Sequence, residues 1–132
     1  MMSQSVRETA MNLLARREHS TRELRDKLLV RGFEQDEITP VLQTLSRDGL
    51  LSDERFTESF IHWRMERGSG PLKIRAELRQ RGVADEIIDA WLDERDRVWL
   101  ARAEAVRCKK FGAALPVEYK EKARQARFLL YR

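Results

Sequence analysis

One stripe of basic side chains in the middle of the chain could bind an anion. Arg75 and Arg79 lie four residues apart, and Lys73 precedes them. On a helix these two arginines share a face that carries no carboxylate, whereas Glu77 lies one turn from both Lys73 and Arg81. Like charges at this spacing destabilise a helix by a few tenths of a kcal/mol. An external carboxylate or phosphate would relieve that repulsion, so Lys73, Arg75 and Arg79 are predicted to contact a partner. The alternative is that they are only solvated.

A second group of basic residues lies near the end of the sequence. The residues predicted to bind DNA are Arg107, Lys109, Lys110, Lys120, Lys122, Arg124 and Arg127. Lysine and arginine neutralise phosphates and release the counterions bound to them. Phe111, Tyr119 and Tyr131 lie among them and could stack on bases, although Phe111 and Tyr119 are more simply interpreted as core residues. Charge therefore favours DNA binding here more than the aromatic residues do.

The sequence has no pattern that indicates catalysis, a metal or a cofactor. His19 and His62 are isolated from any cysteine or carboxylate set with zinc-ligand spacing. Cys108 has no histidine near it in sequence, so an idle thiol is a simpler interpretation than a nucleophile. The stretch RGSGP, residues 67–71, lacks the pattern of a phosphate-binding loop. We expect a protein that is not an enzyme.

The net charge of +4 is unevenly distributed. Residues 1–101 carry 17 basic and 19 acidic side chains, whereas residues 102–132 carry 9 basic and 3 acidic ones. The positive excess therefore lies in the last quarter. A uniformly basic nucleic-acid binder would not show this distribution.

The composition favours helices over strands. Of the 132 residues, 42% are hydrophobic and 36% charged, and the runs rich in Ala, Glu, Leu and Arg are typical of helical proteins. No apolar run is long enough to cross a bilayer, and the first ten residues lack the pattern of a secretion signal. The single cysteine cannot form an internal disulfide, which agrees with a reducing compartment. A cytoplasmic monomer is predicted.

The chain matches itself at an offset of fifty residues without gaps. LRDKLLVRGF at 24–33 corresponds to IRAELRQRGV at 74–83. The identical pairs include Glu8/Glu58, Arg17/Arg67, Arg25/Arg75, Leu28/Leu78, Arg31/Arg81, Gly32/Gly82, Ile38/Ile88, Leu42/Leu92 and Arg47/Arg97. A tandem repeat is the simplest explanation. Because Arg25 takes the place of Arg75 in the first copy, it is also predicted to contact the partner.

Each copy is predicted to form three helices. The sequence S-T-R-E from Ser20 is typical of a capping box, and it begins the second helix of the first copy. Gly32 and Gly82 end the second helix of each copy, because glycine readily adopts the left-handed conformation. Pro40 lies either in the first turn of a helix that starts at Thr39 or inside a longer, kinked helix.

The third helix of the second copy could continue toward Lys110, with Asp96 to Arg97 as the expected break. Trp63, Trp91 and Trp99 fall on apolar helical stripes and are predicted to be core residues.

The expected fold is all-α, with tandem three-helix repeats in an elongated, curved array of right or left hand. The repeats are predicted at 1–49, 50–97 and 98–132. The third is expected to be incomplete, because ARFLLYR at 126–132 matches the KLLVR before the first-copy glycine and no further helix follows it. Such an array could contact a repeating target at several places, which raises the effective concentration for the second contact. The alternative is that duplication only enlarged the core.

The segment LLSDERFTESFIHWRMERGSGPLKIRAELRQRGV, residues 50–83, resembles the central segment of the RecX family of recombination regulators. The similarity lies in Leu-Leu-x-Asp-x-x-Phe, followed by Gly-Pro, an Arg-x-x-Leu helix and Arg-Gly. Phe56, Gly70 and Gly82 occur in this order, and nearly the whole chain can be aligned with the tandem three-helix repeats of the family.

The resemblance implies a protein that binds the RecA filament along its helical groove. It implies suppression of RecA ATP hydrolysis and strand exchange, and thus regulation of recombination, DNA repair and the SOS response. Several family members also bind single- or double-stranded DNA, and none is an enzyme.

Two other functions fit the sequence. The chain could be a sequence-independent DNA-binding protein with helix-turn-helix-like modules, whose affinity for bare DNA would fall steeply with salt. The near-neutral charge of residues 1–101 argues against this interpretation. The chain could also be an adaptor that binds another helical protein through its outer faces.

Overall fold

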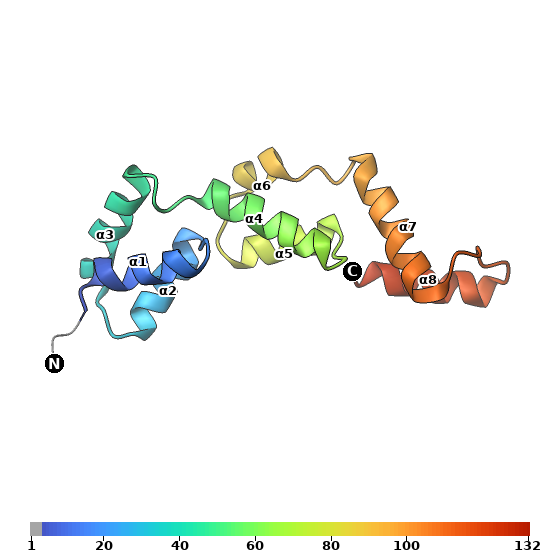
Figure 1. The fold of residues 1–132 in the computed structure, drawn as a ribbon, viewed down its shortest axis with the longest axis horizontal. Coiled ribbons are helices and arrows are strands. Elements are labelled where there is room, and N and C mark those ends of the chain that lie inside the picture. Colours follow the sequence, from blue (N-terminus) through green and yellow to red (C-terminus); the bar gives the residue numbers. More distant parts are fainter. Residues whose placement is uncertain (1–3) are drawn as a thin grey trace.

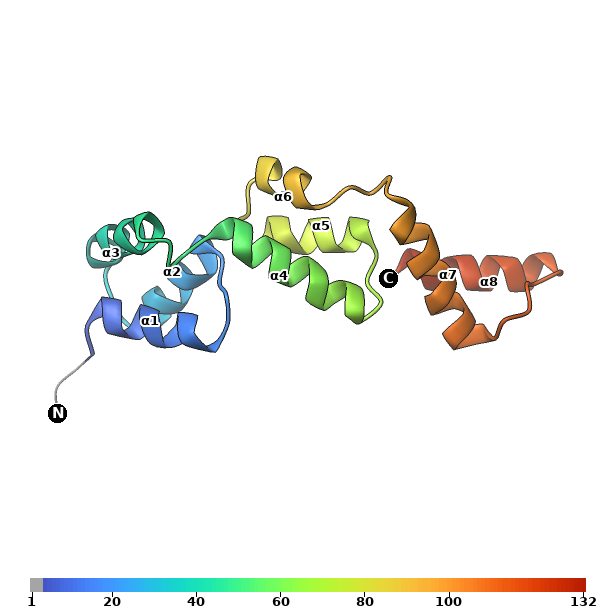
Figure 2. The same cartoon turned by 45° about the horizontal axis from the view of Figure 1, so that its top comes forward.

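Eight helices in three successive units make up residues 4–132, the part of the chain that the computed structural model describes. Their bounds are α1 Val6–Arg16, α2 Thr21–Val30, α3 Gln35–Arg47, α4 Asp53–Glu66, α5 Pro71–Gln80, α6 Asp85–Trp91, α7 Arg97–Phe111 and α8 Tyr119–Leu130. The units follow one another along the long axis of the molecule (Figures 1 and 2). The predicted all-α fold with tandem three-helix repeats is confirmed. Residues 1–3 of the predicted first repeat lie outside the described residues, and the repeat boundaries stay a prediction.

The first unit packs α1, α2 and α3 around one apolar core. Its buried residues are Val6, Ala10, Leu13, Leu24, Leu28, Ile38, Leu42, Leu45 and Leu51. The predicted capping box is present, because Ser20 Oγ accepts from the Glu23 amide and the Glu23 carboxylate accepts from the Ser20 amide, each at 3.1 Å. Pro40 lies inside α3, so the longer of the two predicted helices is the one that forms.

The second unit repeats this arrangement with α4, α5 and α6. Helix α5 covers the residues of α2 shifted by fifty, and α6 begins fifty residues after α3. The buried core residues are Phe56, Phe60, Ile61, Ile74, Leu78, Val83, Ile88 and Leu92. Trp99 packs against this core as predicted, but Trp63 and Trp91 are each 45% exposed, so their assignment to the core is wrong. Trp63 is not among the buried residues of α4, and α6 ends at Trp91.

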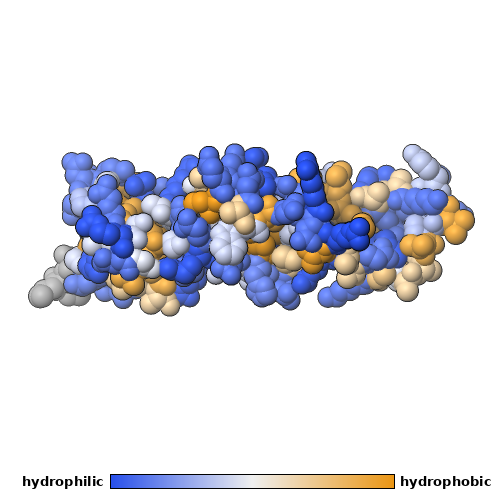
Figure 3. All heavy atoms as spheres, turned by 90° about the horizontal axis from the view of Figure 1, so that it is seen from above, coloured by the Kyte–Doolittle hydropathy of each residue, from blue (hydrophilic) through white to orange (hydrophobic). Residues whose placement is uncertain are grey.

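The third unit contains two helices, α7 and α8. The predicted break is confirmed, because Asp96 caps α7 by accepting from the Val98 amide at 3.0 Å. Phe111 and Phe128 pack edge to face, with ring centroids 5.3 Å apart. Within residues 97–132 the buried side chains are those of Arg107 and Gln125, both polar. The right-hand end of Figure 3 accordingly has apolar spheres on its surface, where the loop between α7 and α8 lies.

No helix of the described chain is long and apolar enough to span a membrane.

Candidate partner interface

Polar hydrogen bonds join the first two units. Asp53, the first residue of α4, accepts from the Thr21 amide at 2.7 Å and from the Thr21 hydroxyl at 3.0 Å. Ser20 Oγ donates to the Arg81 carbonyl at 2.7 Å, in addition to its role in the capping box. The N-terminus of α2 is therefore capped from both units at once. This double capping fixes how the second unit is placed against the first.

Gly82 lies in the same joint. Its φ is +80°, and a Cβ built on it would lie 2.5 Å from Arg22 Cδ and 2.7 Å from Arg22 Cβ. Its counterpart Gly32, with φ +94°, has no atom within 4 Å of such a Cβ. Gly32 is needed only for the left-handed turn, whereas Gly82 is also needed for the approach of α2.

Buried His19 supports the turn before α2. Its Nδ1 lies 3.0 Å from the Arg17 carbonyl, and its Nε2 lies 2.8 Å from Lys27 Nζ. Burial lowers the pKa of His19, with the charge of Arg17 acting in the same direction. The neutral ring therefore donates from Nδ1 and accepts from Lys27.

Arg75 and Arg79, two of the predicted partner-binding residues, are paired with acids of their own chain. Arg75 Nη1 lies 2.7 Å from Asp89 Oδ1, and Arg75 Nε donates to Glu94. Arg79 Nε donates to Asp85 at 2.8 Å. The premise that both arginines lack a carboxylate is wrong, because the acids come from α6 and the segment after it. Hydrogen bonding to Glu94 and then to Asp89 raises the pKa of Arg75.

These two pairs differ in their exposure to water. The Arg75 side chain is only 13% exposed, so it acts as a link between α5 and the α6 region. Arg79 and Asp85 are each 56% exposed, and solvent-exposed pairs contribute little to stability. A carboxylate of a partner could replace Asp85 at small cost, but Arg75 is not available in the same way.

Arg25, the counterpart of Arg75 in the first unit, is different. The two acids that pair with Arg75 are replaced at the offset of fifty by Thr39 and Thr44. Within residues 4–132, Arg25 forms no ion pair, and its buried Nε has no hydrogen-bond partner. Lys73 is exposed and also has no acidic partner in that range. Arg25 and Lys73 are therefore both left without an acidic partner, and of the two only Arg25 also has a buried polar atom without a hydrogen-bond partner in residues 4–132.

The prediction that Arg107 contacts DNA is contradicted by its position. Arg107 is 6% exposed and donates to Glu104 at 2.7 Å and 3.0 Å and to Gln125 Oε1 at 3.0 Å. It also donates to the carbonyl of Ala114, at 3.3 Å. Arg107 thus ties α7 to the following loop and to α8. In a unit whose apolar side chains are not fully buried, a long polar side chain occupies the centre.

The other predicted DNA-binding residues lie at the surface. Arg124 is occupied, since it donates to Glu121 at 2.8 Å and 2.9 Å and lies 4.9 Å from the centroid of the Phe111 ring. Hydrogen bonding from Arg124 lowers the pKa of Glu121 to about 2. Tyr119 and Tyr131 are 83% and 78% exposed, so Tyr119 is not the core residue that was expected. Among the residues predicted to bind DNA, those that are exposed and have no acidic partner within residues 4–132 are Lys109, Lys110, Lys120, Lys122 and Arg127.

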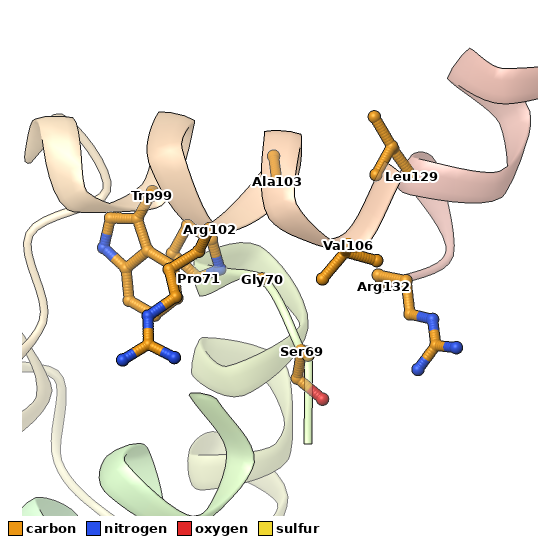
Figure 4. Close-up of a pocket in the computed structure, with 10 residues that line it drawn as sticks. Ser69, Gly70, Pro71, Trp99, Arg102, Ala103, Val106, Leu129 and Arg132 are labelled. Carbon is orange, nitrogen blue, oxygen red and sulfur yellow. The ribbon is translucent and has the colours of Figure 1, made fainter. Parts of the chain in front are cut away.

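A basic hollow of about 480 Å³ lies between the second and third units. The cations that line it are Arg67, Arg102, Lys109, Lys110 and Arg132. Glu66 also lines it and lies 3.5 Å from Arg102. A smaller pocket of about 140 Å³ adjoins it, where Trp99, Arg102 and Val106 extend from α7 toward the Gly70–Pro71 turn (Figure 4).

A second hollow, between the first and second units, was missed by the sequence reasoning. It has a volume of about 480 Å³. Its lining residues are Arg17, Glu18, Glu23, Phe56, Ser59, Phe60, Trp63 and Arg81. The signal in the sequence is the row of Phe56, Phe60 and Trp63 at helical spacing, of which Trp63 was predicted to be a core residue.

Comparison with known proteins gives consistent matches. The family model for the first three-helix domain of RecX matches residues 7–45, and that for the second three-helix domain matches residues 52–92. The "Regulatory protein RecX" of Halorhodospira halophila is 51% identical over 96% of this chain and 79% of its own length. The protein of the same name from Pseudomonas fluorescens strain SBW25 is 47% identical over 97% of this chain and 83% of its own.

A solved structure has a similar fold. The crystal structure of RecX from Lactobacillus salivarius matches with a TM-score of 0.78, over 95% of this chain and 83% of that one. Its sequence identity is 21%, so this match speaks for the fold alone.

Proposed function

This chain belongs to the RecX family of regulatory proteins, and from that premise we propose that it binds the RecA–DNA filament and inhibits RecA. The inhibited activities are ATP hydrolysis and strand exchange, which places the protein in the control of recombination and DNA repair. The observation that carries the proposal is the similarity to RecX proteins along 96% of the chain. The protein acts in stoichiometric amounts, as a cytoplasmic monomer, and is not an enzyme.

The arrangement of the units supports binding to a repeating target. A filament presents the same surface at regular intervals, and an elongated molecule of similar units can contact more than one of them (Figure 1). Once the first contact is made, the second is intramolecular and benefits from a high effective concentration. The double capping between the first two units keeps their spacing fixed, so less conformational freedom is lost on binding.

Inhibition requires more than binding. A ligand shifts an equilibrium only by the difference in its affinity for the two states. On our proposal the protein binds more tightly to one state of the filament. In that state the RecA protomers do not move relative to one another, and the filament groove does not accept a second DNA strand. That preference is what suppresses turnover.

The residues proposed for the filament contact are Arg25, Lys73 and Arg79. Arg25 ranks first because, besides having no ion pair within the described chain, it has a buried Nε without a hydrogen-bond partner, and an acidic group of a partner would compensate its charge. Arg79 ranks after it because its exposed pair with Asp85 can exchange. Arg75, predicted with them, is better explained as a link between α5 and α6.

The experiment that tests this function is a titration of the chain into a DNA-dependent RecA ATPase assay. We expect inhibition to saturate, and Arg25→Glu to raise the half-inhibitory concentration at least tenfold while the circular dichroism spectrum is unchanged. Arg47→Glu, a charge reversal at an exposed residue of α3, is the control. If saturating protein leaves RecA ATPase unaffected, the proposed function is wrong.

A second candidate function, direct DNA binding, is favoured by the unpaired cations of the third unit. Each phosphate contact makes the slope of log affinity against log salt more negative by about 0.9 on duplex DNA. The double variant Lys109→Gln/Lys110→Gln should therefore make that slope less steep by about 2. Lys73→Gln is the comparison, because its cation lies on α5. Undetectable binding to bare DNA at 50 mM salt would remove this candidate.

A further inference from the structure

The hollow between the first and second units has an aromatic floor that is already ordered. The centroids of Phe56 and Phe60 are 5.6 Å apart, and those of Phe60 and Trp63 are 6.0 Å apart. Trp63 is contacted by two guanidinium groups that follow it in sequence, since Arg64 Cζ and Arg67 Cζ each lie 4.6 Å from its ring centroid. These contacts restrain the indole before anything binds, although 45% of the residue is exposed.

The two carboxylates in the hollow are already neutralised by the chain. Glu18 accepts from Arg55 Nε at 2.9 Å. Glu23 lies 3.3 Å from Arg17 and 3.6 Å from Arg81. Burial raises the pKa of Glu23, but the hydrogen bonds from Ser20 and Arg17 outweigh it, so the net shift is downward and the group stays ionised at neutral pH.

Arg67 lies beside this hollow, against Trp63, and it also lines the basic hollow between the second and third units. It forms no ion pair with any acid in the described part of the chain. The lining carries two arginines and two glutamates, Arg17, Arg81, Glu18 and Glu23, so the hollow itself offers no net positive charge to a phosphodiester chain. A single carboxylate at the edge, followed by an apolar group over the aromatic floor, matches this distribution better than a nucleic acid does.

We propose that this hollow is the docking site for one apolar side chain of the protein partner, with an adjacent Asp or Glu of the partner pairing with Arg67. Tryptophan and arginine are the residue types that most often dominate binding energy at interfaces. The volume of about 480 Å³ is in the range typical of ligand pockets. In taking the RecA filament as the partner, this inference rests on the proposed function.

The test begins with two tryptophans that are equally exposed. Trp63 and Trp91 are each 45% exposed, but only Trp63 lines the hollow. We expect Trp63→Ala to weaken binding of the full chain to the RecA–DNA filament at least tenfold, and Trp91→Ala to change it less than twofold. Arg67→Glu should weaken binding similarly. Ser59→Arg, which fills the hollow and removes no stabilising contact of Trp63, guards against a folding defect in Trp63→Ala.

A second arm does not depend on the filament. An acetylated hexapeptide with phenylalanine between two aspartates is titrated into the full chain, and the indole N–H signals of the tryptophans are followed by NMR. We expect the Trp63 signal to shift most, and the same peptide with lysines in place of the aspartates to bind at least fivefold more weakly. Oligothymidine serves as the nucleic-acid probe.

The outcomes separate the two proposals. If the wild-type chain binds the filament and Trp63→Ala and Ser59→Arg bind equally well, the docking site is wrong while the proposed function stands. If the wild-type chain does not bind the filament, the proposed function is wrong, and the peptide arm alone decides the docking site. Equal affinity for the two peptides, or a Trp63 shift with oligothymidine alone, overturns the inference.

Discussion

Gly32 and Gly82 occupy equivalent positions at the ends of α2 and α5, yet their surroundings differ. Both have positive φ, where any L residue with a side chain is strained. Only Gly82 has the side chain of Arg22 against it. The repeated Arg-Gly sequence therefore predicted the turn correctly at both positions, but the additional steric demand at Gly82 arises from the neighbouring unit.

We predict that Gly32→Ala lowers the free energy of unfolding by about 1–2 kcal/mol, the cost of the left-handed conformation. Gly82→Ala should cost at least about 1 kcal/mol more, because crowding adds to it. Urea unfolding followed by circular dichroism measures the difference. Equal losses in the two variants would mean that Arg22 moves away without cost.

Arg107 gives a second prediction at this scale. Arg107→Ala should lower the midpoint of thermal unfolding more than Lys109→Ala does, because it removes the donor to Gln125 and to the loop carbonyl of Ala114. Differential scanning calorimetry on both variants tests it. A midpoint unchanged by Arg107→Ala would show that the central guanidinium does not hold α8.

At the scale of helices, the local signals were sufficient for most ends. The capping box at Ser20 and the glycines after α2 and α5 were predicted from short sequence patterns, and the break before α7 was predicted at Asp96 to Arg97. The ion pairs of Arg75 could not be predicted in the same way. Asp89 and Glu94 are 14 and 19 residues away in sequence and reach Arg75 only when α6 packs on α5. Helical spacing detects partners within one helix, and these lie outside it.

The start of α2 should make stability sensitive to acid. Since the folded-state pKa of Glu23 lies below its ordinary value of 4.5, the ionised group stabilises the fold at neutral pH. That contribution is lost as pH falls from the ordinary pKa through the folded one. Below pH 5, the free energy of unfolding should fall less steeply with pH in Glu23→Gln than in the wild-type chain. Urea titration at successive pH values measures both slopes. Identical slopes in both proteins would contradict this.

In the whole molecule, the three units differ in how they are held together. The first two have apolar cores, whereas the third depends on Arg107, Gln125 and one aromatic pair in the described residues. The overall array was predictable, since the offset of fifty residues defines two copies. The absence of a buried apolar side chain from residues 97–132 was not predictable in this way, since predicted core residues such as Tyr119 lie at the surface.

We therefore predict that the amides of α8 exchange with deuterium faster than those of α2 and α5, because fewer buried apolar contacts oppose local opening. Hydrogen exchange followed by mass spectrometry on the full chain gives the comparison. Similar protection in α8 and α5 would contradict it.

The different partners of Arg25 and Arg75 mean that the duplicated scaffold is not symmetric in what it offers. Thr39 and Thr44 offer no carboxylate to Arg25, whereas Asp89 and Glu94, fifty residues later, pair with Arg75. The double variant Thr39→Asp/Thr44→Glu should give Arg25 the two ion pairs that Arg75 has. We expect it to reduce affinity for the filament as much as Arg25→Glu does. Unaltered affinity would show that pairing of this arginine does not decide which copy binds the filament. On our proposal, two threonines in the first copy determine that its arginine, and not the equivalent one in the second, is available to the target.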